Sequence, residues 1–120
     1  MTRGAWKEGL SRRHRFAGRG AFAPALRSRH TLRTPALLLH VAAGKPGESR
    51  LGLVVPKRLA RRSVDRNRFK RLAREAFRRH AVKSAGLDLV LAIRAKVGPD
   101  EEAAWLEQWQ DLLARAAEAR

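Results

Sequence analysis

The chain of 120 residues contains no cysteine, and it holds only 11 acidic residues against 27 lysines and arginines. Without cysteine it can form neither a disulfide framework nor a thiolate metal site. No apolar run approaches the roughly 20 residues that a membrane-spanning helix needs. Residues 1–10 lack the continuous apolar segment of a secretory signal. We therefore expect a cytoplasmic protein that makes no contact with a membrane.

Groups for protein-based catalysis are also scarce. Between residues 9 and 87 the only acids are Glu48, Asp65 and Glu75, and they are scattered. Hydrolysis of a phosphodiester by a protein usually needs clustered carboxylates that hold metal ions about 3.5–4 Å apart. The four histidines, at positions 14, 30, 40 and 80, show neither metal-ligand nor general-base spacing. We predict no catalytic residue, no metal ligand and no self-sufficient active site.

Positive charge dominates the amino-acid composition. The formal net charge is +16, and residues 9–87 contain 21 basic residues against three acids. From residue 100 to 118 the balance reverses, with six acids against Arg115 alone. A surplus of one sign destabilises the compact state, so it usually serves an anionic partner. Arginine predominates, and its planar fork suits phosphate oxygens. The composition therefore predicts a nucleic-acid-binding protein.

The apolar pattern predicts one domain with a small sheet, since 120 residues is the size of a single domain. Residues 36–42 and 50–55 form apolar runs typical of buried strands, and the turn cluster at 44–47 predicts that they pair as an antiparallel hairpin. Pro56 lacks a backbone donor and is expected to end the second strand. Residues 88–93 predict a further strand.

Helical spacing predicts three helices. A short one at 18–29 would place Phe22 and Leu26 one turn apart, but it contains Pro24, which a helix tolerates only close to its start. A final helix begins near Pro99, where Asp100 can cap free amides. It carries one apolar stripe that we assign to the core rather than to base stacking. The stripe consists of Trp105, Leu106, Trp109, Leu112, Leu113 and Ala116.

The central helix, at 64–82, has two distinct faces. Cations recur every four residues and should line one face: Arg66, Lys70, Arg74 and Arg78. Apolar residues fall on another face that can dock on a sheet: Phe69, Leu72, Ala73, Ala76 and Phe77. Asn67 and Arg71 border the basic face, and Asp65 is expected to cap the helix start. This helix is therefore the predicted nucleic-acid-binding element.

The same helix resembles the RNR helix of the bacterial ribonuclease P protein subunit. The matching pattern is Arg66-Asn67-Arg68-x-Lys70-Arg71-x-x-Arg74-Glu75-x-Phe77-Arg78. Weaker resemblances in the same order extend the match over residues 10–115: 22–26 to the family's phenylalanine motif, 51–58 to its strand and basic pair, 84–94 to its next strand and 105–113 to its final helix. The chain departs from the family at Pro56 and Leu59, and its linker 58–65 is about one residue longer.

The resemblance implies an α/β (α+β) sandwich: a mostly antiparallel four-stranded sheet with a βαβ crossover helix, an N-terminal helix and a C-terminal helix. In this family the strand–helix–strand unit, here residues 51–93, is left-handed, against the usual rule. Residues 1–120 would form a single RNA-binding domain, family-like over 10–115, with residues 1–9 flexible.

The resemblance also implies a function: the accessory protein subunit of ribonuclease P, the endoribonuclease that matures the 5′ end of tRNA. Catalysis would belong to an RNA subunit with Mg²⁺, and the protein alone would bind no cofactor. Its partners would be that catalytic RNA and the 5′ leader of precursor tRNA. The implied RNA-binding residues are Arg66, Asn67, Arg68, Lys70, Arg71, Arg74 and Arg78. The implied leader-binding residues are Phe22, Leu26, His40, Lys57 and Arg58.

Two alternatives stay open on the residues alone. A ribosomal protein, or another protein that binds structured RNA, would be equally basic and equally non-enzymatic. A DNA-binding module could use residues 64–82 as a recognition helix, but a helix-turn-helix needs another helix shortly before it. In this chain a predicted strand and a basic linker precede residues 64–82 instead of a helix. Phe22 is also ambiguous, because the same aromatic side chain could line a leader cleft or pack in the core.

Overall fold

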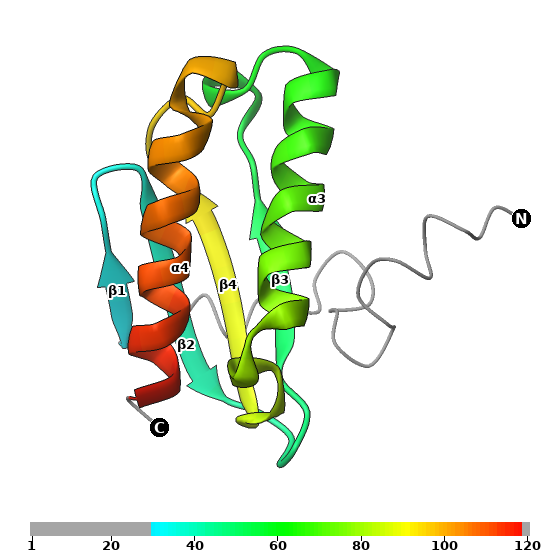
Figure 1. The fold of residues 1–120 in the computed structure, drawn as a ribbon, viewed down its shortest axis with the longest axis vertical. Coiled ribbons are helices and arrows are strands. Elements are labelled where there is room, and N and C mark those ends of the chain that lie inside the picture. The colour runs from blue at the N-terminus through cyan, green and yellow to red at the C-terminus, as the bar shows by residue number, and fades with distance from the viewer. Residues whose placement is uncertain (1–29, 119–120) are drawn as a thin grey trace, which may run out of the picture.

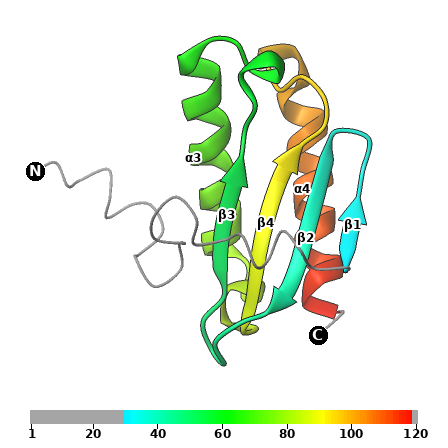
Figure 2. The ribbon, with the colours of Figure 1, turned by 180° about the vertical axis from the view of Figure 1, so that it is seen from behind.

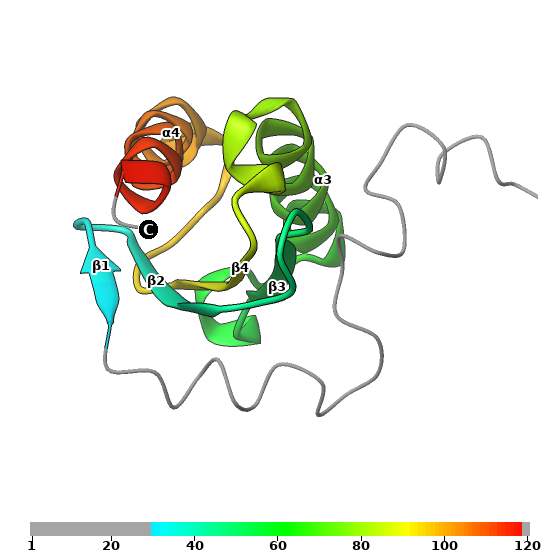
Figure 3. The same cartoon turned by 90° about the horizontal axis from the view of Figure 1, so that it is seen from below.

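The computed structural model describes residues 30–118, which form a two-layer α+β fold (Figure 1). The predicted N-terminal helix at 18–29, with Phe22 and Leu26, lies outside the described residues. The elements are β1 (Thr31–Arg33), β2 (Leu37–Ala43), β3 (Arg50–Val54), the 3-10 helix η2 (Lys57–Leu59), α3 (Ser63–Arg79), η3 (Ala81–Ser84), β4 (Leu87–Ile93), η4 (Pro99–Glu101) and α4 (Glu102–Glu118). Both α-helices cover the same face of the sheet (Figure 3).

The four strands are arranged in the order β1-β2-β4-β3. β2 pairs antiparallel with β1 and with β4, and β4 pairs parallel with β3. The sheet is therefore mostly antiparallel, as predicted, but the expected hairpin between β2 and β3 is wrong. β4 lies between them because it is the strand that is buried on both faces, with Leu89, Val90 and Leu91 fully inaccessible. The hairpin partner of β2 is instead β1, whose three residues are too few to show an alternation of apolar and polar side chains.

The β3–α3–β4 unit is a left-handed crossover. In Figure 1 both strands point upward, the helices lie in front of the sheet, and β4 lies to the left of β3. The resemblance to the ribonuclease P family implied this handedness. Nearly all other parallel crossovers are right-handed.

The core lies between the sheet and the two helices. Alternate residues of β2 and β4, such as Leu39 and Leu91, point toward the helices, because side chains alternate along a strand. The Phe69 and Trp105 rings of α3 and α4 lie 4.4 Å apart between centroids. Trp109 is fully buried, and its Nε1 donates a hydrogen bond to the Ala73 carbonyl at 3.0 Å. The predicted assignment of the α4 stripe to the core is confirmed.

Both predicted helix caps are different in the structure. Asp65 lies in the first turn of α3, but its carboxylate accepts two hydrogen bonds from Arg62, at 2.8 and 3.0 Å, and none from a helix amide. A bidentate guanidinium is the stronger, charge-assisted partner, and it lowers the pKa of Asp65. At the start of the last helical segment, the carboxylate that accepts a backbone N–H is Glu101, from Gly98 at 2.8 Å, rather than Asp100.

Candidate functional site

The α3 helix concentrates positive charge on its solvent side. It contains seven cations and two acids, and its buried residues are Phe69, Ala73 and Phe77. Asp65 is bound by Arg62, and Glu75 Oε2 lies 3.9 Å from Arg78 and 3.6 Å from Arg79. The acids of α3 are therefore already occupied by neighbouring arginines, and the net charge of its exposed surface is strongly positive.

Arg66 lies on the flank of α3 that faces the preceding linker. Its Nη1 donates to the carbonyls of Ala60 and Arg61, both at 2.9 Å. These bonds hold the linker against the first turn of the helix. Arg66 therefore supports the local fold, and only its remaining donors are available for a ligand.

Arg68 lies on the opposite flank, since two residues correspond to roughly 200° around a helix. Its guanidinium makes two hydrogen bonds to Glu102 in the first turn of α4, one of them at 3.0 Å. The Arg68 hydrogen bond is the main cause of a lowered pKa at Glu102, with a smaller contribution from the charge of Arg71. The seven predicted RNA-binding residues therefore do not share one face.

The exposed crest of α3 lies between these two flanks. Asn67 and Arg71 are exposed there, while Lys70, Arg74 and Arg78 are half-buried. Lys70, Arg74 and Arg78 recur every four residues along this crest, as the sequence predicted. In the part of the chain that the structure describes, the Nε of Arg78 is buried without a hydrogen-bond partner.

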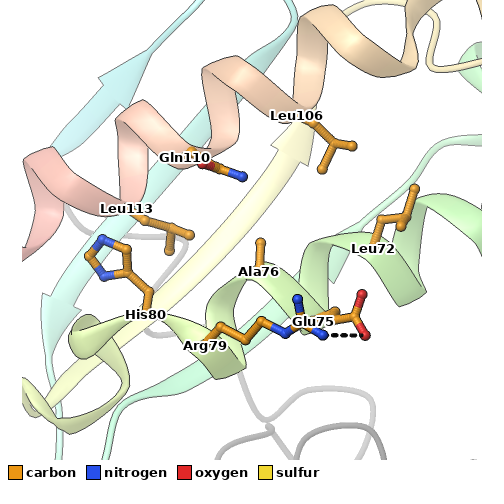
Figure 4. Close-up of a pocket in the computed structure, with 8 residues that line it drawn as sticks. All are labelled: Leu72, Glu75, Ala76, Arg79, His80, Leu106, Gln110 and Leu113. Carbon is orange, nitrogen blue, oxygen red and sulfur yellow. Dashed lines mark ion pairs between the residues drawn. The ribbon is translucent and has the colours of Figure 1, made fainter.

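A groove of about 330 Å³ separates α3 from α4 (Figure 4). Its walls are apolar at Leu72 and Leu106, and the Glu75–Arg79 ion pair lies at its rim. His80 also lines it, and its Nδ1 accepts the Val82 N–H at 3.0 Å, as expected for a residue at a helix end. None of the predicted RNA-binding residues lines this groove.

The opposite face of the sheet is not covered by either α-helix (Figure 2). We call it the open face. His40 lies near its centre, opposite Thr31 on β1 and Val90 on β4. Burial lowers the pKa of His40, so the imidazole is neutral at pH 7. Its Nδ1 is buried and has no hydrogen-bond partner among residues 30–118. The neutral ring thus offers a stacking surface and an unused polar atom.

The two ends of the open face differ in charge. At one end, Lys57 and Arg58 follow β3 in η2, and both are exposed. At the other end, Arg50 binds Asp88 through hydrogen bonds of 3.0 and 2.7 Å. A side chain at Gly44 would come within 2.6 Å of the Asp88 carboxylate, so Asp88 is closely packed, whereas the Arg50 side chain is still 39% exposed. Cations are therefore free to bind an anion mainly at the η2 end.

The structure brings three of the five predicted leader-binding residues, His40, Lys57 and Arg58, to the open face and its end. Phe22 and Leu26 cannot be placed, because they lie outside the described residues. Sequence reasoning missed two further cations of this face, Arg33 and Arg94. The signal that identifies them is the strand register, which no local pattern reveals.

The described part of the chain offers neither a metal site nor a membrane-spanning helix. Residues 30–118 contain no group of three or more histidines, aspartates or glutamates that could hold a metal ion. Within the same residues, no helix combines the length and the apolar character needed to cross a membrane.

Comparisons with known proteins agree on one family. The ribonuclease P family model matches residues 10–117. The ribonuclease P protein component of Nitrosomonas eutropha is 40% identical over 99 residues, which cover 80% of this chain and 81% of that protein. The component from Nitrosomonas europaea is 45% identical over 76 residues, which cover 63% of this chain and 64% of that protein.

Solved structures give the same result. The RNase P protein from Thermotoga maritima superposes with a TM-score of 0.67 at 28% identity, and the match covers 78% of this chain and 89% of that one. The RNase P protein from Staphylococcus aureus, at 22% identity and a TM-score of 0.66, supports the fold alone; it covers 90% of this chain and 92% of that one. The chain therefore belongs to the ribonuclease P protein family, whose members are the accessory subunit of the holoenzyme that removes the 5′ leader of tRNA.

Proposed function

We propose that this chain binds the catalytic RNA of ribonuclease P through α3 and the 5′ leader of precursor tRNA through the open face of the sheet. The observation that carries the proposal is the charge of α3, with seven cations against two acids that neighbouring arginines already bind. The proposed contacts to the catalytic RNA are Arg66, Asn67, Arg68, Lys70, Arg71, Arg74 and Arg78.

The chemistry of the RNA contacts is mainly electrostatic. Cations on α3 neutralise phosphates and release counterions, which supplies most of the affinity of such interfaces. Asn67 carries both a donor and an acceptor, so it can make a directional hydrogen bond. Arg66 contributes the donors that its contacts with Ala60 and Arg61 leave free. Neutralisation of phosphates lowers the amount of Mg²⁺ that the RNA needs to fold.

The leader site combines a stacking surface with cations. The neutral ring of His40 lies in the middle of the open face, and Lys57 and Arg58 lie at its end. Single-stranded nucleic acids bind to such surfaces, with bases on apolar or aromatic groups and phosphates on cations. Phe22 and Leu26, outside the described residues, are proposed to complete the stacking surface.

In this proposal the protein contributes no catalytic side chain. The catalytic RNA binds the Mg²⁺ ions and cleaves the phosphodiester, while the protein holds the leader and stabilises the RNA. Residues 1–120 act as one RNA-binding domain in the cytoplasm.

The double variant Lys57→Gln/Arg58→Gln tests the leader site. The reconstituted holoenzyme should bind precursor tRNA about tenfold more weakly, because two cations that neutralise leader phosphates are removed. Its affinity for mature tRNA, which has no leader, should stay nearly unchanged. Dissociation constants for both tRNAs provide the measurement.

A matched control is Lys45→Gln/Lys83→Gln, which removes the same charge from the far end of the sheet. It should leave both affinities close to those of the wild type. Equally weakened binding of precursor and mature tRNA by the Lys57/Arg58 variant would show that these residues do not bind the leader.

A further inference from the structure

The arginine that joins α3 to α4 still has one edge of its guanidinium available. Arg68 donates from Nε and Nη2 to the two carboxylate oxygens of Glu102, the second hydrogen bond at 3.0 Å. These bonds occupy the side-on edge of the planar group. The end-on edge, formed by Nη1 and the second N–H of Nη2, has no hydrogen-bond partner among residues 30–118. The Arg68 side chain is 50% exposed, so a ligand in solution can reach this edge.

The packing of the two helices fixes where the carboxylate of Glu102 lies. α3 and α4 run side by side with their first turns at the same end (Figure 1). Next to Arg68 and Glu102, the rings of Phe69 and Trp105 pack against each other with centroids 4.4 Å apart, and both are buried. Because these rings hold the first turn of α4 against α3, the backbone of Glu102 is fixed beside Arg68.

The start of α4 does not depend on Glu102 for its cap. Glu101 accepts the Gly98 N–H at 2.8 Å, and Asp100 adds a negative charge at the same helix end. An ion pair between exposed side chains contributes little to stability. The main consequence of the pair is therefore the orientation that it gives to Arg68.

An arginine that is already held in place binds a phosphate more tightly than a free one does. Its long side chain loses rotational freedom on binding, and part of that loss has already occurred when a carboxylate fixes the guanidinium. The end-on edge presents two parallel N–H groups, which match two oxygens of one phosphate. The hydrogen bond from Arg68 and, more weakly, the charge of Arg71 lower the pKa of Glu102, so its carboxylate is ionised and holds Arg68 at neutral pH.

We propose that Glu102 is a positioning residue for RNA binding: it holds Arg68 so that the end-on edge of the guanidinium binds one phosphate of the catalytic RNA. This inference rests on the proposed binding of that RNA to α3. The carboxylate stays on the side-on edge in the complex, so Arg68 bridges Glu102 and the phosphate. Glu102 thereby strengthens the binding of an anion, although it is an anion itself.

The test is the variant Glu102→Gln, which keeps the size of the side chain and removes its charge. A purely electrostatic effect would strengthen RNA binding, because an acid beside the RNA is lost. We expect the opposite: about three- to tenfold weaker binding of the catalytic RNA, the range that the ordering of one long side chain spans. The slope of log K against log salt should stay the same, because the number of neutralised phosphates does not change. Titrations at several salt concentrations give both quantities.

The effect of Glu102 should require Arg68. Arg68→Gln should weaken binding and reduce the salt slope by about one, since one phosphate contact is lost. In the Arg68→Gln background, Glu102→Gln should no longer weaken binding. Glu102→Asp keeps the carboxylate and should recover part of the affinity. The matched control is Glu107→Gln, at an exposed position of the same helix, which should not weaken binding.

Tighter or unchanged RNA binding by folded Glu102→Gln would overturn the inference, because the carboxylate would then compete with the RNA or serve the fold alone. An equal loss of affinity with and without Arg68 would also overturn it. The variant Lys70→Gln/Arg71→Gln/Arg74→Gln separates this inference from the proposed function. If that variant weakens binding while Glu102→Gln does not, only the inference is wrong. If that variant leaves the affinity and the salt slope unchanged, the proposed site on α3 is wrong. Thermal unfolding of each variant verifies that the fold is intact.

Discussion

Replacement of Lys70, Arg71 and Arg74 by glutamine is expected to weaken binding of the catalytic RNA by on the order of 100- to 1,000-fold. Each charged hydrogen bond contributes about 1.5 kcal/mol, so the loss of two or three of them costs about 3–4.5 kcal/mol, and a factor of ten corresponds to 1.4 kcal/mol. The slope of log K against log salt should fall by about two to three units, one for each phosphate that the variant no longer neutralises. Arg66 is left in place, because its bonds to Ala60 and Arg61 support the fold.

The matched control removes three charges from other parts of the surface: Lys45→Gln, Lys83→Gln and Arg115→Gln. It changes the net charge equally but should reduce the salt slope only slightly, because these residues do not lie on α3. Titrations at several salt concentrations give the slopes, and thermal unfolding shows whether both variants fold. An unchanged slope in the folded α3 variant would mean that another surface binds the RNA.

The substitution Trp109→Ala is expected to destabilise the protein by about 3–5 kcal/mol, the usual cost of removing a large aromatic side chain from a core. Trp109 is fully inaccessible to solvent and joins α4 to α3 through its hydrogen bond to Ala73. Domains of this size are stable by only about 5–15 kcal/mol. The variant should therefore lose a large part of its stability, and its RNA binding should fall with its folded fraction.

Urea unfolding of the wild type and the variant measures this destabilisation. Glu107→Ala, an exposed position on the same helix, should change the stability by no more than about 0.5 kcal/mol. Trp109→Phe keeps most of the apolar volume and should lie between the two. A stability of Trp109→Ala within about 1 kcal/mol of the wild type would show that α4 is not part of the core.

The elements themselves could be predicted because their signals are local. The period of α3 places Phe69, Ala73 and Phe77 on one face, and all three are buried. The stripe of α4 is equally clear from its spacing. These patterns depend only on how side chains are distributed around a helix, so they survive in any tertiary arrangement.

Strand pairing could not be read in the same way. A turn cluster between β2 and β3 predicted a hairpin, yet β4 separates the two strands. A central strand is the one most fully covered on both faces, and the apolar run of β4 suits that position better than β3, which contains Gly52. The left-handed crossover opposes the general rule, so only the resemblance to the ribonuclease P family indicated it.

The candidate site shows the same difference between local patterns and tertiary contacts. The spacing of the cations along α3 is a local pattern, so it could be predicted from the sequence. The partners of the two flanks depend on tertiary contacts, since Arg68 binds Glu102 at a distance of 34 residues in sequence. Arg33 and Arg94 become neighbours of the open face only through the register of β1, β2 and β4.

The most direct test of the central claim is an assay of precursor tRNA cleavage with three mixtures at low Mg²⁺: the protein alone, a bacterial ribonuclease P RNA alone, and both together. We expect cleavage of the 5′ leader only when both are present, because the protein acts by binding the RNA and the leader and supplies no catalytic group. Cleavage by protein that has been rigorously freed of RNA, or an absence of stimulation in the combined mixture, would contradict the account.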